Sequence, residues 1–272
     1  CNTMGTASSM NSIAEALGMS LPGGAIIPAP YKERTDISFK TGKRIVEMVF
    51  ENLTPSKIMT KEAFENAVYV ASAIGASSNC PPHLTAIARH MGVDFSLDQW
   101  EKLGHSIPLL ANCQPAGEHL MEGFFKAGGI PAIMKELIKD KKLNIKALTV
   151  TGKTIEENLN MKIDVNRDVI KSYENPLSHN AGFIVMKSNF FSSAVMKTSV
   201  ISSEFRERYL SNKDSLNIFE VKAVVFEGPE DYHTRINDDN LKIDENSILI
   251  IRGCGPVGYP GSAEVVNMQP PD

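Results

Sequence analysis

The sequence predicts an α/β domain followed by a β-rich domain, and three observations support this. Over the first 150 residues or so, apolar residues recur at helical spacing. A short apolar run, IPLLAN (107–112), falls between two of these helices, and buried strands between helices are typical of an α/β layer arrangement. From about residue 175, short runs rich in β-branched residues alternate with Asn, Ser, Asp and Gly, which is typical of a small barrel or sandwich.

The expected helices follow from apolar spacing and from signals at their ends. In the first, residues 10–17 place Met, Ile, Ala and Leu on one face, Ser12 and Glu15 match a capping box, and Gly18 is a stop signal. Proline in a first turn marks two later helices. We expect further helices at 44–53, after Thr60, from Pro82 to Gly92, and from Pro131.

The expected strands belong to the second half of the chain. They are the β-branched runs at 182–190, 193–201, 221–228 and 247–253. SNKDSLN (211–217) is expected to be an exposed loop. A polar stretch at 159–175 precedes the strands, so we place the domain boundary between residues 172 and 173 and predict domains 1–172 and 173–272.

Composition excludes several classes of protein. Of 272 residues, 42% are hydrophobic and 22% charged, as in soluble globular proteins. The net charge of −4 comes without a basic stripe, which disfavours nucleic acid as a partner. No apolar run approaches the roughly 20 residues of a membrane span, so we expect no membrane partner and a cytoplasmic location. The four cysteines lack a C-x-x-C spacing, as in reduced intracellular proteins.

A glycine-rich loop, RGCGPVGYPGSAE (252–264), follows the last expected strand. Gly253, Gly255 and Gly258 match the dinucleotide fingerprint G-x-G-x-x-G. That fingerprint needs a helix directly after the glycines, whereas Tyr259 and a proline follow here, so a nucleotide site is disfavoured. Two alternatives stay open: a tight turn that needs glycine, or a loop that brings Glu264 to a bound cation such as Mg²⁺.

Seven stretches of the chain stand out, in this order: CNTMGTASSMNSIAEALGMSLPG, KRIVEMVFENLTPSKIMTKEAFENA, HLTAIARHMGV, IPLLANCQPAG, GGIPAIMKEL, AVVFEGPEDYHTRI and GPVGYPGSAEV. Together they are similar to the dihydroxy-acid and 6-phosphogluconate dehydratases, a family of iron–sulfur enzymes, and the resemblance covers nearly the whole chain. EGPEDYHTRI and GYPGSAE resemble most the sugar-acid dehydratases of the L-arabinonate or D-xylonate type.

The resemblance implies a fold and a reaction. The fold is an α/β domain with a parallel sheet followed by a β-barrel domain. The reaction dehydrates a small-molecule sugar acid, a 2,3-dihydroxy pentonate, to a 2-keto-3-deoxy acid with Mg²⁺ and an iron–sulfur cluster, 2Fe-2S rather than 4Fe-4S, in a homodimer or homotetramer. Two alternatives are a branched-chain dihydroxy-acid dehydratase, which could be mitochondrial, and a non-catalytic truncated fragment.

The resemblance also implies roles for particular residues. Cys1 opens the C-x-x-M-G-T-A motif and would be a cluster ligand, and Glu264 in the GYPGSAE loop would be a Mg²⁺ ligand. A thiolate just before a helix N-terminus is physically favourable. The cysteines Cys80, Cys113 and Cys254 and the six histidines receive no ligand role. Proposed substrate contacts are Ser77, Ser78, Asn79, Gly258, Tyr259 and Gly261.

Two features limit this transfer of roles. Residues 75–79 are G-A-S-S-N where the family has G-G-S-T-N, and a helix cap for the segment near Pro82 is an equal alternative for Ser77–Asn79. The chain begins at Cys1 and ends at Asp272, so we expect an internal fragment of a longer protein, with the family's serine base beyond Asp272. No catalytic base is therefore expected among these residues, and the isolated chain is expected to be inactive.

Overall fold

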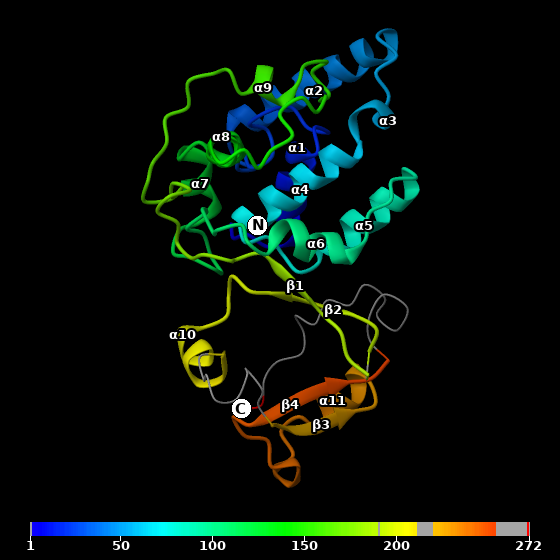
Figure 1. Cartoon of the computed structure of the whole chain (residues 1–272), viewed down its shortest axis with the longest axis vertical. Helices are drawn as coiled ribbons and strands as arrows, with labels where there is room; N and C mark the ends of the chain where they lie inside the picture. The colour runs from blue at the N-terminus through cyan, green and yellow to red at the C-terminus, as the bar shows by residue number, and fades with distance from the viewer. Residues whose placement is uncertain (1, 190, 211–219, 254–270, 272) are drawn as a thin grey trace. The chain divides into compact units, whose positions relative to one another are not determined.

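The computed structural model describes residues 2–189, 191–210, 220–253 and 271 (Figure 1). The chain divides into two compact units, Cys1–Val200 and Ile201–Asp272. The first unit contains α1 (Thr6–Ala16), α2 (Lys32–Phe50), α3 (Pro55–Ile58), α4 (Lys61–Ala73), α5 (Cys80–His90), α6 (Leu97–Gly104), α7 (Met121–Lys126), α8 (Gly129–Lys139), α9 (Ile155–Asn158), β1 (Phe183–Met186) and β2 (Ala194–Lys197).

The second unit is smaller. Strands β3 and β4 are parallel, with Lys222 opposite Ser247 and Phe226 opposite Ile251, and α11 lies between them in the chain. Val224, Phe226 and Tyr232 form the core of this unit. Its elements are α10 (Ser203–Phe205), the π-helix η1 (Arg206–Leu210), β3 (Lys222–Phe226), α11 (Pro229–Arg235), the 3₁₀-helix η2 (Asp239–Leu241) and β4 (Ser247–Ile251).

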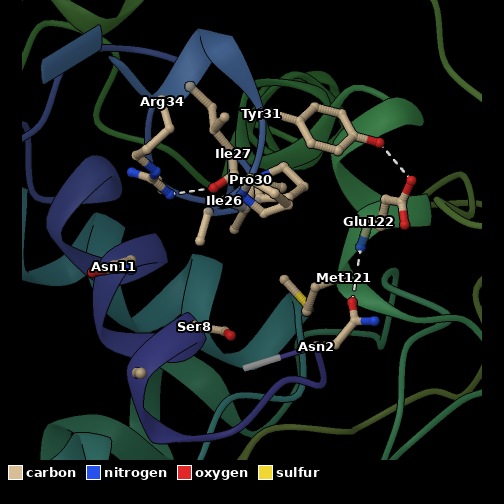
Figure 2. A pocket seen from close by; sticks show the side chains of 14 residues that line it. Asn2, Ser8, Asn11, Ile26, Ile27, Pro30, Tyr31, Arg34, Met121 and Glu122 are labelled. Carbon is tan, nitrogen blue, oxygen red and sulfur yellow. Dashed lines mark hydrogen bonds between the residues drawn. The ribbon is translucent and has the colours of Figure 1, made fainter.

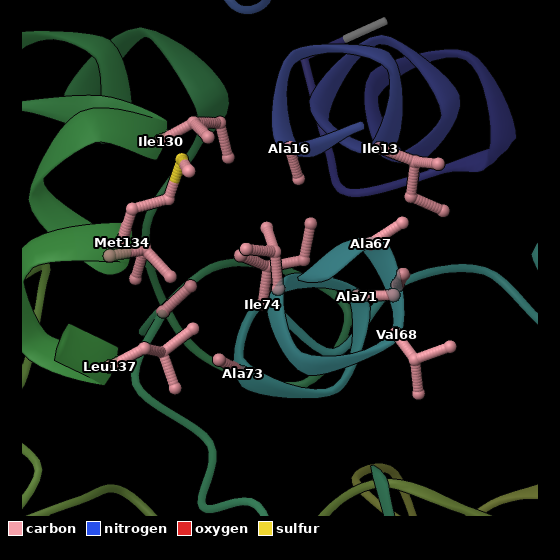
Figure 3. Close-up of a cluster of buried hydrophobic side chains, with 14 of the residues drawn as sticks. Ile13, Ala16, Ala67, Val68, Ala71, Ala73, Ile74, Ile130, Met134 and Leu137 are labelled. Carbon is pink, nitrogen blue, oxygen red and sulfur yellow. The ribbon is translucent and has the colours of Figure 1, made fainter. Parts of the chain in front are cut away.

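The core of the first unit is built around α4, which is apolar on nearly every side. Such a helix is expected to be buried, and Phe64, Ala67, Val68 and Ala71 are 0% exposed. The alanines have small side chains, which lets neighbouring helices approach α4 closely. Figure 3 shows the side chains that surround α4, namely Ile13 and Ala16 from α1 and Ile130, Met134 and Leu137 from α8.

The first helix begins earlier than its predicted signals indicate. The stop at Gly18 is confirmed, because Gly18 follows the end of α1 with a φ of +81°. The capping box is wrong: α1 starts at Thr6, so Ser12 and Glu15 lie in its interior. The Ser12 hydroxyl donates to the Ser8 carbonyl at 2.8 Å instead of capping a free N–H.

All four expected strands occur, each shorter than or equal to its expected span. The run 107–112 is buried and extended, but it forms isolated bridges, Leu109 with Ser178 and Ala111 with Ile170, and no ladder. The residues described here hold two sheets of two strands each, β1 with β2 and β3 with β4, and neither closes into a barrel. The α/β-plus-barrel fold therefore stays a prediction for the complete protein.

The hairpin of β1 and β2 belongs to the first unit. Its strands are antiparallel, with Phe183 opposite Lys197. The Phe183 ring packs edge-on against Trp100 of α6, with ring centroids 5.2 Å apart. This contact extends the first compact unit to Val200, beyond the domain boundary predicted between residues 172 and 173. The expected loop at 211–217 lies outside the described residues.

None of the helices in the described ranges is both long enough and apolar enough to cross a lipid bilayer.

Candidate functional site

The loop that contains the predicted site residues Ser77, Ser78 and Asn79 lies against the start of α1. Ser77, Ser78 and Asn79 are described, and Ser77 and Asn79 form hydrogen bonds with this helix. The predicted metal ligands Cys1 and Glu264, and the predicted substrate contacts Gly258, Tyr259 and Gly261, lie outside the described residues. The described part of the candidate site therefore consists of the residues that follow Cys1 and the loop before α5.

The segment that follows Cys1 is held by backbone hydrogen bonds. The Met121 N–H donates to the Asn2 carbonyl at 3.0 Å, and the Glu122 N–H donates to Asn2 Oδ1 at 3.3 Å. The Met4 N–H donates to the Gln114 carbonyl at 2.8 Å. These bonds fasten the residue next to Cys1 at the beginning of α7.

The N-terminus of α1 carries no charge of its own to offset its dipole. Gly5 is the N-cap residue and offers no side-chain cap, and the first turn contains no acidic residue. The free N–H groups and the positive end of the helix dipole therefore favour an anion nearby.

The loop Ser77–Asn79 is fastened to α1 by its own polar side chains. The Ser77 and Thr6 hydroxyls lie 3.0 Å apart, and the Ser77 N–H donates to the Ser9 hydroxyl at 2.9 Å. The Asn79 amide donates to the Thr6 hydroxyl at 2.8 Å. We call these residues, Thr6, Ser9, Ser77 and Asn79, the α1–α5 junction.

The junction separates the roles of the three predicted loop residues. Ser77 and Asn79 position the loop, whereas Ser78 is exposed to solvent. The helix-cap alternative is confirmed only in position: Asn79 occupies the N-cap position of α5, but its side chain makes no cap bond there. Sequence reasoning did not single out Thr6 or Ser9, although Thr6 lies in the C-x-x-M-G-T-A motif and Ser9 lies two residues after it.

Cys80, the first residue of α5, lies next to the junction. Burial raises the pKa of its thiol to about 12, outweighing the Ser9 hydroxyl and the charge of Lys197, which both lower it. Burial likewise raises the pKa of Cys113 to about 12. Both thiols are therefore protonated at neutral pH, which disfavours them as ligands or nucleophiles. In the described ranges, no three His, Cys, Asp or Glu side chains gather as a metal site.

A pocket of about 480 Å³ adjoins the segment after Cys1 (Figure 2). Tyr31 donates to the Glu122 carboxylate at its edge, and Arg34 donates to the Ile27 carbonyl. Ser8 and Asn11 line the pocket from α1. Residues 8 and 11 lie on the opposite face of the helix from residues 6 and 9, so this pocket and the α1–α5 junction are separate features.

Comparison with family models and relatives extends this description to the whole chain. Residues 1–158 match the model described as dihydroxy-acid/6-phosphogluconate dehydratase N-terminal. Residues 168–272 match the corresponding C-terminal model. The two matches meet near the predicted boundary at 172/173, whereas the compact units divide after Val200.

Named relatives agree with the family models. The chain is 54% identical to D-xylonate dehydratase of Caulobacter vibrioides over all 272 residues, which are 46% of that protein. It is 46% identical to L-arabinonate dehydratase of Rhizobium leguminosarum over 94% of the chain and 42% of the relative. It is 38% identical to dihydroxy-acid dehydratase of Acetivibrio thermocellus over 98% of the chain and 46% of the relative. The chain thus spans less than half the length of these relatives, and it belongs to the dihydroxy-acid/6-phosphogluconate dehydratase family.

Proposed function

We propose that the complete protein containing this chain dehydrates a 2,3-dihydroxy sugar acid of the pentonate type to a 2-keto-3-deoxy acid. The observation that supports this most is the order of similarity among the relatives. Identity is 54% to D-xylonate dehydratase and 46% to L-arabinonate dehydratase, against 38% to a dihydroxy-acid dehydratase.

The proposal assigns the metals to Cys1 and Glu264. An iron–sulfur cluster, 2Fe-2S by preference, would be held in part by the Cys1 thiolate, and Mg²⁺ by the Glu264 carboxylate. When bound, these groups would supply Lewis acidity toward the leaving hydroxyl and toward the charge that develops beside the substrate carboxylate. The uncapped, acid-free start of α1 supports this placement because it favours negative charge beside Cys1.

The proposal assigns substrate contacts to two loops. Ser78, which is exposed and held in place by its neighbours, would donate to or accept from a sugar hydroxyl. Gly258, Tyr259 and Gly261 would line the substrate from the second loop. A homodimer or homotetramer in the cytoplasm is part of the same proposal.

A substrate screen tests the reaction. The complete protein, reconstituted with iron, sulfide and Mg²⁺, would be incubated with D-xylonate, L-arabinonate and 2,3-dihydroxyisovalerate, and the keto acid would be measured as its semicarbazone. We expect turnover of a pentonate. Turnover of 2,3-dihydroxyisovalerate alone would instead favour the branched-chain alternative. That alternative is supported by the 38% identity to a dihydroxy-acid dehydratase. No turnover of any acid would overturn the proposal.

Two variants test the metal assignments within the same protein. Glu264→Gln keeps the size of the side chain but loses its charge, so we expect no turnover and unchanged visible absorbance of the cluster. Cys1→Ser replaces a thiolate with a poorer iron ligand, so we expect the visible absorbance to be lost. Wild-type turnover in the first variant, or an unchanged spectrum in the second, would contradict the corresponding assignment.

A further inference from the structure

Lys197, the last residue of β2, is a half-buried cation without a counter-ion among the described residues. Its ammonium makes no hydrogen bond or ion pair with any residue that the structure describes. The same hairpin offers a contrast, because Lys187 is exposed and its ammonium lies 3.0 Å from the Asp98 carboxylate. Sequence reasoning did not single out Lys197, since a lysine at a strand end carries no motif.

The surroundings of Lys197 do not neutralise it. Burial lowers the pKa of the ammonium to about 8, so it is still mostly charged at neutral pH. The titratable group that interacts with it is Cys80, whose pKa of about 12 makes it a neutral thiol. Burying an ammonium without an anionic partner is unfavourable, and such groups are enriched at functional sites.

The position of Lys197 connects it to the α1–α5 junction. Its charge acts on Cys80, whose thiol also interacts with the Ser9 hydroxyl of the junction. Two residues further on, Ser199 Oγ lies 3.2 Å from the point where a Cβ on Gly75 would be, just before the loop. Ser199 Oγ is itself buried without a hydrogen-bond partner among the described residues. The hairpin thus presents a cation and an unpartnered hydroxyl to residues 75–80.

We infer that Lys197 binds the carboxylate of the sugar acid beside the loop that carries Ser78. The inference rests on the proposed function and adds to it the residue that recognises the acid group. A carboxylate would provide the missing counter-charge, and an ammonium-to-carboxylate hydrogen bond is charge-assisted and stronger than a neutral one. The Ser199 hydroxyl has a free donor for the same group.

The experiment compares substrate and inhibitor binding in variants of the complete, reconstituted protein. Lys197→Met removes the charge and keeps the length of the side chain, Lys197→Arg keeps the charge, and Lys187→Met is the matched control on the same hairpin. We expect Lys197→Met to raise KM for D-xylonate by about tenfold to a hundredfold. Lys197→Arg should retain most of the affinity, and Lys187→Met should match the wild type.

Xylitol has the hydroxyls of the sugar acid but no carboxylate. It therefore distinguishes a loss of carboxylate binding from a structural effect of the substitution. As a competitive inhibitor it should bind Lys197→Met as well as it binds the wild type, whereas a merely structural effect would weaken both ligands. Folding is checked by circular dichroism, and Lys197→Gln serves as a second neutral variant should Lys197→Met not fold. An unchanged KM for D-xylonate in the neutral variants would overturn the inference and leave the proposed function standing.

Failure of the proposed function is recognised separately. If the wild-type protein turns over no sugar acid, calorimetric titration with D-xylonate still tests Lys197. Binding to the wild type that is lost in Lys197→Met would support the inference. Equal binding to both proteins, or binding to neither, would overturn it.

Discussion

At the scale of single residues, Glu15 is a buried carboxylate of the first unit. It lies in α1, is only 6% exposed, and accepts hydrogen bonds from the N–H groups of Gly23 at 2.7 Å and Ala25 at 2.9 Å. Burial raises the pKa of its carboxyl to about 7, and the two hydrogen bonds only partly offset this. Glu15 therefore ties the loop after α1 to the helix, and Ala25 of that loop lines the pocket in Figure 2.

The raised pKa predicts a pH-dependent stability. Between pH 4.5 and 7 the folded chain keeps the Glu15 proton while the unfolded chain has lost it, so the free energy of unfolding falls as pH rises. The expected contribution of Glu15 is about 3 kcal/mol over this window. Urea unfolding of the chain at pH 5 and pH 8, followed by Trp100 fluorescence, would measure it. Glu15→Gln does not titrate and should lack this component, so an equal decrease in both proteins would contradict the prediction.

At the scale of elements, the contact between α6 and β1 joins the hairpin to the helices. Trp100 and Phe183 are both fully buried, and their rings meet edge-on. This geometry is favourable for aromatic pairs beyond the area that they bury. Since the hairpin carries Lys197, the same contact also sets the position of the proposed carboxylate-binding residue.

Removing one ring tests this contact. Phe183→Ala leaves a cavity against Trp100, so we expect the free energy of unfolding to fall by about 3–5 kcal/mol. Trp100 is the single tryptophan of the chain, and its emission should shift to the red as water gains access. Met161→Ala is the control, because Met161 lies outside these elements, is 50% exposed and should change stability by no more than about 0.5 kcal/mol. Equal effects of the two substitutions would rule out a special role for the α6–β1 contact.

At the scale of the whole molecule, α2 leaves an apolar face open to solvent. Phe39, Val46 and Phe50 recur seven and four residues apart, which places them on one side of the helix. They are 76%, 55% and 87% exposed in the described part of the chain. Exposed apolar side chains on one side of a helix favour association.

We therefore expect the isolated chain to associate through α2. Sedimentation velocity should show a sedimentation coefficient that rises with protein concentration. Charged substitutions on the face, Val46→Lys with Phe50→Lys, should abolish the rise. Met161→Lys, at an exposed methionine outside α2, should leave it intact. A wild-type coefficient independent of concentration, or equal association of the double variant, would refute the role of α2.

Some features of the fold could be predicted because they are encoded locally. The spacing of apolar residues correctly predicted α4, α5, α8 and the four strands, since helix and strand periods are properties of short segments. The capping box failed for the complementary reason. Ser12 and Glu15 have the spacing of a helix start, but the packing of α1 extends the helix to Thr6 and gives Glu15 a partner in the following loop.

The sequence by itself determined the family, because ordered motifs spread over the whole chain do not depend on how the chain packs. It also indicated Ser77, Ser78 and Asn79 as site residues. It did not indicate that Ser77 and Asn79 bond to α1 whereas Ser78 is exposed. Only the tertiary structure shows that Thr6 contacts Ser77, 71 residues further along the chain. It also shows that Lys197 interacts with Cys80 and has no counter-ion among the described residues. The physical reason is that such contacts form when whole helices and the hairpin pack together. A local sequence pattern does not specify which distant residue a side chain will contact.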